Sequence, residues 1–375
     1  MKIFFLSDGS SIHTKKWVNS LIDNGLTIHL FSLSRFDIND YPLENFSYTF
    51  FDIQRRISVC AGFGKINYLR VLPALKKEIK KFVPDIVHAH FASSYGLLGA
   101  LSGFHPFVIS VWGTDVFEFP EKSFVHRMVL RFNLSKADKI LSTSHVMAEK
   151  TSCYTNKEIA VTPFGIDLNV FKKEKVSRSE LSPFNDKDLV VGTVKLLEKK
   201  YGINFLIEAF SIVTRKHPDI PLKLLIVGDG NERKTLEKMV ENLGLKEKVH
   251  FKGMVPHLKV SQYHKIIDIF IALSEEESFG VAIVEAGACE KPVVVSDAGG
   301  LPEVVDDGVT GFVIKRKNSY AASKALEILV LDEELRVRMG VAGRKRVEKL
   351  YNWKDNVDTM IEIYINILEM KRKSR

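Results

Sequence analysis

The chain has 375 residues, which is long enough for two domains that each bury a core of their own. Its 45% apolar content fits a globular protein and argues against a disordered or fibrous one. No apolar run reaches the ~20 residues of a membrane-spanning helix, and the first residues lack the pattern of a signal peptide.

The formal net charge of +8 is unevenly placed along the chain. Residues 1–176 hold 22 basic and 16 acidic side chains, whereas the remainder holds 32 and 30. A basic first half suits an anionic partner such as a membrane surface, and an ordinary basic surface explains it equally well. Cys60, Cys153 and Cys289 have no metal-like spacing, so we expect reduced thiols in a cytoplasmic protein.

In the first half, short apolar runs alternate with helical patterns, which predicts a parallel sheet covered by helices. Strands are expected at 2–6, 27–33, 85–90, 107–111, 139–143 and 159–163, and helices at 14–24, at 73–82 and from residue 144. Residues 36–64 are predicted to be irregular. The second helix carries Lys76, Lys77, Lys80 and Lys81, which could lie on anionic lipid headgroups or form a solvated face.

Several polar residues of this half follow expected strands, where open α/β sheets bind their ligands. The first loop, 8–13, lacks the G-x-G-x-x-G pattern, so a dinucleotide site is not supported. His88 and His90 alternate along one strand and should share a face. They could bind a metal or lie satisfied in the core, and no third ligand is near in sequence. Asp115 after the next strand fits a helix N-cap.

The second half repeats the alternation after a boundary at 163–188. Strands are expected at 189–194, 222–228, 249–252, 268–273, 293–295 and 310–314, and helices at 204–216, 232–243, 319–331, 333–350 and 353–371. Asp186-Lys187-Asp188 matches a D-x-D metal motif. It lies in a polar turn and is interpreted as solvated, so no metal requirement is predicted.

The stretch 268–303 reads as strand, acidic loop, helix and strand, which is one parallel crossover unit. Gly280 lies where the helix should begin, so bare N–H groups and the positive end of the dipole could meet a phosphate. Glu277 and Glu285 lie eight residues apart around this point and could accept hydrogen bonds from sugar or ribose hydroxyls. Alternatively, Glu277 is part of a solvated cap at the N-terminus of the helix and binds no ligand.

The run from Glu277 to Glu285 resembles the E-x7-E signature of retaining glycosyltransferases of family four, which have the GT-B fold. Similar pieces follow the family's order at 228–230, 251–253, 299–303 and 308–312. The resemblance implies two Rossmann-like α/β domains facing across a cleft. Residues 1–168, joined by a returning helix at about 354–375, would bind the acceptor, and residues 186–353 would bind the nucleotide sugar.

The resemblance also implies roles for single residues. A basic pair five apart grips the leaving diphosphate, which gives Lys195 and Lys200 here, with Lys199 as a rival because Tyr201 precedes the glycine. Relatives carry a histidine where Trp112 stands, so Trp112 could stack on a sugar and Asp115 becomes the candidate for a hydroxyl contact or base. The catalytic candidates are Glu277, Lys195, Lys200 and Asp115. The candidates for donor binding are Glu285, Phe279, Gly280, Val281, Ser278, Gly253, Val255 and Gly9. The candidates for acceptor binding are His13, His90, Trp112 and Gly113.

The implied reaction is transfer of a sugar from a nucleotide diphosphate, most commonly UDP, to a hydroxyl of a glycan or lipid-linked acceptor with retention of configuration. Bacterial surface polysaccharide synthesis at the inner face of the cell membrane is the expected setting, and domain closure would exclude water. No metal, NAD or nucleic acid is expected. The alternatives are an epimerase or phosphorylase of the same fold and a non-catalytic sugar-nucleotide binder.

Overall fold

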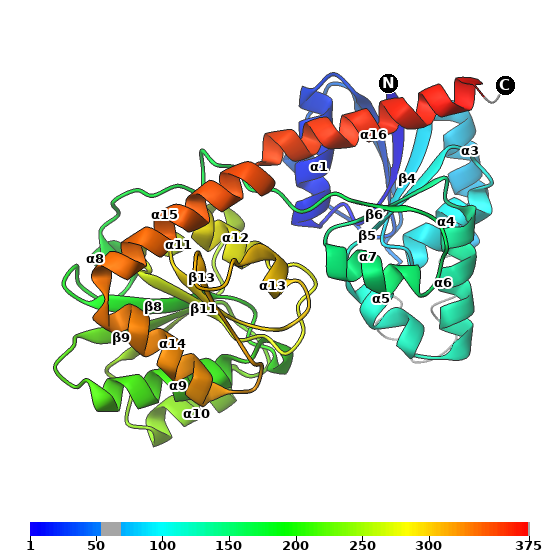
Figure 1. Cartoon of the computed structure of the whole chain (residues 1–375). Coiled ribbons are helices and arrows are strands. Elements are labelled where there is room, and N and C mark those ends of the chain that lie inside the picture. Colours follow the sequence, from blue (N-terminus) through cyan, green and yellow to red (C-terminus); the bar gives the residue numbers. More distant parts are fainter. Residues whose placement is uncertain (54–68, 374–375) are drawn as a thin grey trace. The chain divides into compact units, whose positions relative to one another are not determined.

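The computed structural model describes residues 1–53 and 69–373 of the chain. The chain divides into two compact units, and each unit is a parallel sheet covered by helices (Figure 1). Unit 1 comprises Met1–Pro163 and Asp355–Arg375, and unit 2 comprises Phe164–Lys354.

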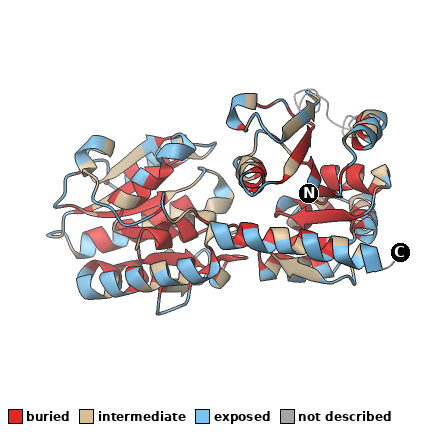
Figure 2. Cartoon of the chain, turned by 90° about the horizontal axis from the view of Figure 1, so that it is seen from above, coloured by how far each residue is buried: buried red, intermediate tan, exposed pale blue. Residues whose placement is uncertain are grey.

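The sheet of unit 1 has seven strands within the described residues, in the order β3-β2-β1-β4-β5-β6-β7, with all pairs parallel. Its strands are β1 (Lys2–Leu6), β2 (Thr27–Ser32), β3 (Phe46–Phe50), β4 (Ile86–His90), β5 (Phe107–Val111), β6 (Lys139–Ser142) and β7 (Ile159–Val161). The central strands β4 and β5 are buried along their whole length, as expected for parallel strands covered on both faces (Figure 2).

Helices cover both faces of this sheet. They are α1 (Ile12–Asp23), α3 (Leu72–Phe82), α4 (Ser94–Ser102), α5 (Thr114–Phe117), α6 (Phe124–Lys136) and α7 (His145–Ser152). Apolar side chains of α3, α4 and α6 pack with those of the sheet into one core cluster.

The last helix, α16 (Trp353–Lys373), belongs to unit 1 from Asp355 onward. The Tyr364 hydroxyl lies 2.6 Å from Nδ1 of His88, and Lys371 Nζ donates to the His105 carbonyl at 2.6 Å. These contacts confirm the prediction that the C-terminal helix returns to the first domain.

Unit 2 holds a sheet of six parallel strands within the described residues, in the order β10-β9-β8-β11-β12-β13. Its strands are β8 (Leu189–Val194), β9 (Leu222–Val227), β10 (Val249–Gly253), β11 (Ile269–Ala272), β12 (Val293–Ser296) and β13 (Gly311–Ile314). The helices are α8 (Arg178–Leu181), α9 (Ile203–Lys216), α10 (Arg233–Asn242), α11 (His257–Ile266), α12 (Val281–Ala288), α13 (Leu301–Val304), α14 (Ser319–Leu331) and α15 (Glu333–Leu350).

The order of this second sheet reverses between two neighbouring strands. From β8 the chain builds outward through β9 and β10, then returns to place β11 against the other side of β8. Loops that leave these two strands diverge at the carboxyl edge of the sheet. Such a switch point is where doubly wound sheets bind ligands.

The two-domain prediction and most element positions agree with the structure, with a few corrections. Strand β3 lies where irregular structure was expected, and α4, α6 and α11 were not predicted. The part of the irregular prediction at 54–64, and Cys60, lie outside the described residues. Cys153 and Cys289 are free thiols. Among the described residues, no helix has the length and apolar character needed to cross a bilayer.

Candidate active site

The acidic loop between β11 and α12 is held in place by its backbone. Glu275 N–H donates to the Lys200 carbonyl at 2.7 Å, and the Glu277 carbonyl accepts from Gly300 N–H at 3.0 Å. The Ser296 hydroxyl donates to the Ser274 carbonyl at 2.5 Å. The loop is therefore fixed by neighbours on both sides, independently of its own carboxylates.

Glu277 forms an ion pair with Lys195, which directly follows β8. The two side chains are only 11% and 15% exposed, so their charges are largely shielded from water. The Lys195 ammonium also lies 4.5 Å from the ring centroid of Tyr201. Because β8 and β11 are neighbours, this pair stands at the switch point of the sheet.

Helix α12 begins beside this pair at a glycine. Gly280 is the N-cap with φ +105°, which L side chains rarely adopt, and a Cβ there would lie 2.8 Å from Leu301 Cδ2. The backbone conformation and the Leu301 side chain therefore both require glycine here, where α12 has its first amides and the positive end of its dipole. The predicted helix start is confirmed.

Two glycines in the turn between β12 and α13 pack closely against the backbone of the acidic loop. Gly299 has φ +48°, and a Cβ on it would overlap the Glu277 carbonyl oxygen. A Cβ on Gly300 would lie 2.6 Å from the Ser278 carbonyl oxygen. The turn between β12 and α13 thus packs directly on the backbone that carries Glu277.

Glu285 is buried in α12 and has a protein partner. Its Oε2 lies 3.0 Å from Nε2 of His264 in α11, and the His264 side chain is fully buried. The His264 ring packs against Phe270, with ring centroids 5.2 Å apart. The sequence showed that a buried Glu285 needs a partner, but the partner comes from another helix and was not identified.

Lys200 is one of the two candidates for the second lysine of the basic pair. Its ammonium lies 5.4 Å from the Tyr201 ring, so Lys195 and Lys200 both contact the one aromatic ring. Lys200 Nζ also lies 3.5 Å from a Glu198 carboxylate oxygen. Lys199, the rival, has an exposed side chain. The intervening Tyr201 is therefore part of the cationic cluster.

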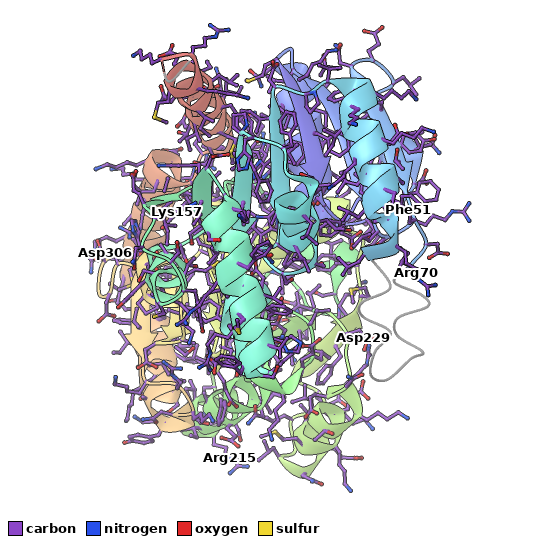
Figure 3. All side chains as sticks on the ribbon, turned by 90° about the vertical axis from the view of Figure 1, so that its right-hand side faces the viewer. Phe51, Arg70, Lys157, Arg215, Asp229 and Asp306 are labelled. Atoms are coloured by element: carbon purple, nitrogen blue, oxygen red, sulfur yellow. The ribbon has the colours of Figure 1, made fainter. Side chains whose placement is uncertain are left out.

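Loops after β9 and β10 reach the same edge of the sheet. Gly228 has φ +134°, a Cβ on it would overlap the Lys195 carbonyl, and its N–H donates to the Gly253 carbonyl at 3.0 Å. Asp229, labelled in Figure 3, pairs with Arg233 at 3.1 Å. Val255 is half-buried just beyond Gly253.

Among the donor candidates, Phe279 has a buried side chain. Its side chain is 3% exposed and packs edge-on against Phe164 and Tyr351, with centroids 6.0 and 5.5 Å away. It can offer a ligand its backbone only. Ser278 and Val281 flank it on the loop and at the start of α12, and both are half-buried.

In unit 1, the aromatic candidates form one cluster of tilted and edge-on rings. The rings of His90 and Trp112 are 4.3 Å apart, and those of Trp112 and His13 are 5.8 Å apart. Trp112 is only 8% exposed, so its ring is mostly covered by protein and the expected sugar stacking lacks an open face. His88 and His90 do share one face, with centroids 4.8 Å apart, and burial lowers the pKa of both well below its usual value.

Asp115 and Gly113 are engaged in hydrogen bonds within unit 1. The buried Asp115 carboxylate accepts backbone N–H groups from Ala92 at 2.7 Å, Gly113 at 2.8 Å and Trp112 at 3.2 Å. These bonds occupy the oxygens that a base or hydroxyl contact would need, and burial raises the pKa of Asp115. Asp115 shapes the turn after β5, which is the capping alternative, and the Gly113 N–H is used within that turn.

Gly9 has a hydrogen-bond partner for each of its backbone groups. Its N–H donates to the Ser32 hydroxyl at 3.1 Å, and its carbonyl accepts from Tyr41 at 2.7 Å. The Phe36 ring covers it, so that a Cβ would lie 2.6 Å from Phe36 Cγ. Both backbone groups of Gly9 are therefore occupied inside unit 1.

The D-x-D turn is less solvated than expected. Asp188 is 6% exposed and its carboxylate accepts from Asn185 N–H at 2.9 Å, which fixes the turn before β8. Within the described part of the chain, no group of three His, Cys, Asp or Glu side chains is arranged to hold a metal ion.

Comparison with known families shows to which family the chain belongs. Residues 176–346 match the family model of glycosyl transferases group 1, and residues 2–144 match the glycosyl transferase 4-like model. The chain belongs to the group 1 glycosyltransferases, family four. The resemblance carried by the E-x7-E run is confirmed, and the chain is a glycosyltransferase enzyme.

Individual relatives agree with this assignment. The glycosyltransferase is similar to N-acetyl-alpha-D-glucosaminyl L-malate synthase of Bacillus anthracis, with 27% identity over 293 residues, which are 76% of this chain and 75% of that protein. Among solved structures, sucrose-phosphate synthase from Thermosynechococcus elongatus has a TM-score of 0.84 at 20% identity, covering 99% of this chain and 100% of that one. Anabaena HepE in complex with UDP and glucose has a TM-score of 0.80 at 20% identity, covering 98% and 100%. These structures confirm the GT-B fold.

Proposed function

We propose that this glycosyltransferase moves a sugar from a nucleotide diphosphate to an acceptor hydroxyl with retention of configuration. The observation that carries the proposal is the shielded Lys195–Glu277 pair at the switch point, beside the glycine start of α12. This part of unit 2 brings together a cation, a helix terminus and a carboxylate. Those groups suit a diphosphate attached to a sugar with several hydroxyls.

The donor would lie along the carboxyl edge of the unit 2 sheet. Lys195, Lys200 and the first amides of α12 would hold the diphosphate, and Glu277 would accept hydrogen bonds from hydroxyls of the transferred sugar. Glu285, kept in place by His264, would meet the ribose diol. Backbone groups at Gly253 and Val255 would contact the base.

The reaction requires charge stabilisation more than a nucleophilic side chain. The bond between the anomeric carbon and the phosphate oxygen breaks, and a bond from the acceptor oxygen forms on the same face. The acceptor proton passes to the departing phosphate oxygen. Negative charge grows on that diphosphate, where Lys195 and the α12 amides lie in a partly water-excluded site and can lower the barrier.

A UDP-sugar is the donor that we propose. The support is the fold shared with HepE, whose structure is described as a complex with UDP and glucose, and the sugar named in the Bacillus anthracis relative. No metal takes part in this proposal, because the lysines and the helix terminus supply the positive charge.

The acceptor that we propose is a glycan or lipid-linked hydroxyl, as in bacterial surface polysaccharide synthesis. The basic surplus of residues 1–176 supports an acceptor that carries phosphate or lies at an anionic surface. His13 and His90, which belong to the aromatic cluster of unit 1, are kept as acceptor candidates.

The test is proton NMR of the purified chain with UDP-sugars and EDTA, with and without sugar acceptors. Transfer or slow hydrolysis should yield a product whose anomeric coupling matches that of the donor. A product of the opposite configuration contradicts retention. A new UDP-sugar formed without acceptor identifies an epimerase, and binding without any turnover identifies a sugar-nucleotide binder.

A further inference from the structure

Helix α6 of unit 1 exposes a row of large apolar side chains. Phe124 is 70% exposed, Val125 66%, Met128 55% and Phe132 38%. Phe124, Met128 and Phe132 are four residues apart, so they line one side of the helix, with Val125 beside them. We name these four residues the α6 ridge.

The ridge points away from the protein core. On the opposite side of α6, Leu130, Asn133 and Leu134 are buried. Asn133 Nδ2 donates to the Ala92 carbonyl at 2.7 Å and to the Ser93 carbonyl at 3.1 Å, which fixes the rotation of the helix. The ridge is therefore a firmly held outward face, and neighbouring apolar side chains that face water mark an interaction site.

The charged side chains of α6 itself are all basic, while Glu121 before the helix pairs with Arg127 and Lys150. Helix α6 contains no Asp or Glu, and the side chains of Arg131 and Lys136 are exposed at its margins. The Lys136 ammonium lies 5.6 Å from the Phe132 ring centroid. Lys122 is exposed just before the helix. An apolar face with basic margins is typical of helices that lie in the headgroup region of a bilayer.

An open hollow adjoins the C-terminal half of α6. It has a volume of about 590 Å³, and Arg131, Ser135, Ser152 and Thr155 contribute to its lining. Lys157, labelled in Figure 3, also lines it and donates to the carbonyls of Ser135 and Ala137 at the end of α6. A guanidinium with hydroxyls beside it is suited to a phosphate headgroup.

We propose that the α6 ridge docks unit 1 on an anionic lipid bilayer. The four apolar side chains enter the region between headgroups and acyl chains, while Arg131 and Lys136 meet lipid phosphates. The surplus of cations favours a lipid phosphate surface over a second copy of this basic chain, which would place like charges together. The inference does not depend on which sugar the enzyme transfers.

This surface differs from the lysine face considered from the sequence alone. In α3 the side chains of Lys76, Lys77, Lys80 and Lys81 are exposed, but its apolar residues Leu75 and Ile79 are buried. Helix α3 therefore has basic side chains but no exposed large apolar side chains that could insert into a bilayer, whereas α6 has exposed side chains of both kinds. The lysine face remains an untested prediction.

The test is co-sedimentation of the full chain with vesicles of phosphatidylcholine alone and of phosphatidylcholine with phosphatidylglycerol. The wild type should bind the anionic vesicles, and the double variant F124S/M128S should bind about tenfold or more weakly because it loses insertable apolar area. Leu258→Ser is the matched control, since Leu258 is 90% exposed in α11. It should bind like the wild type.

Several outcomes would overturn the proposal. The proposal is wrong if the wild type does not bind anionic vesicles, or if F124S/M128S binds them as tightly as the wild type. It is also wrong if K76Q/K77Q/K80Q/K81Q loses binding while F124S/M128S keeps it. A wild-type dimer in light scattering that F124S/M128S makes monomeric assigns the ridge to a second copy instead. Should F124S/M128S not fold, Met128→Trp gives a second readout. Its fluorescence should shift to the blue on anionic vesicles, and an unchanged spectrum contradicts insertion.

Discussion

Glu277 and Lys195 neutralise each other in the absence of a ligand, so replacing one changes the charge that a donor meets. In Glu277→Gln the loop should keep its shape, because backbone bonds to Lys200 and Gly300 hold it. We expect kcat to fall by about 100-fold or more, as for loss of a group that acts in the transition state.

Steady-state turnover of a UDP-sugar measures this effect. Glu276→Gln is the matched control, because Glu276 is the exposed neighbour of Glu277 and should be replaceable without loss. Equal activity of Glu277→Gln and Glu276→Gln would remove Glu277 from the proposed mechanism.

In the proposed donor site, His264 acts through its contact with Glu285. His264→Phe removes the histidine that contacts the buried Glu285 carboxylate, and we expect donor KM to rise by about tenfold with kcat little changed, as for lost ground-state binding. His264→Gln, whose amide can donate, should recover part of the affinity. Calorimetry of UDP binding checks this, with exposed His257→Gln as control. Unaltered UDP affinity in His264→Phe would show that this contact is structural only.

At the residue scale, sequence reasoning succeeded where position depends on local structure. Gly280 and Lys195 stand at a helix start and a strand end, which short-range patterns predict. The partners of Asp115 and Gly9 were not predicted because they are remote: Ala92 lies 23 residues before Asp115, and Ser32 and Tyr41 lie 23 and 32 residues after Gly9. No spacing rule reveals that such groups are already occupied.

The turn between β12 and α13 supports the acidic loop as one element. Gly299→Ala should push the Glu277 carbonyl away and lower both stability and kcat. Gly308→Ala is the matched control, since Gly308 also has positive φ, at +74°, but an added Cβ would meet open space. Both variants carry the conformational cost of about 1 kcal/mol, and only Gly299→Ala adds the clash.

Thermal unfolding and turnover of the two glycine variants separate these effects. We expect a clearly lower melting temperature and activity for Gly299→Ala than for Gly308→Ala. If the two variants behave alike, the turn does not position Glu277.

At the scale of elements, strands were easier to predict than some helices. Strand β3 was missed because aromatic residues dominate 36–50, yet Phe46, Tyr48 and Phe50 alternate along it and their neighbouring rings stack. Helix α6 was missed because its exposed face is apolar, so the usual contrast between an apolar and a polar side is weak. That weak contrast is the feature from which we infer membrane docking.

At the scale of the molecule, unit 1 should be the acid-sensitive part. Burial lowers the pKa of His29 to about 4, with a contribution from Lys81, and that of His88 to about 3. Unfolded histidines titrate near the ordinary value of 6.5, so between that pH and 3–4 the unfolded state binds more protons. Stability is therefore full above about pH 6.5 and falls as pH drops, by up to about 1.4 kcal/mol per pH unit for each histidine.

Urea unfolding followed by tryptophan fluorescence at pH 7.5, 6 and 5 measures this slope. His88→Gln should make the dependence shallower, and His257→Gln, at an exposed position, should leave it unchanged. A free energy of unfolding that stays constant from pH 7.5 to 5 would contradict the linkage.

The most direct test of the donor site is the thermal shift of the full chain with UDP and UDP-sugars in EDTA. A donor at about 100 times its Kd should add about 2.7 kcal/mol to the stability of the folded state. We expect this shift in the wild type and in the exposed-lysine control Lys199→Ala, and its loss in Lys195→Ala. An equal shift in Lys195→Ala, or none in the wild type with any UDP-sugar, would contradict the placement of the donor at the start of α12.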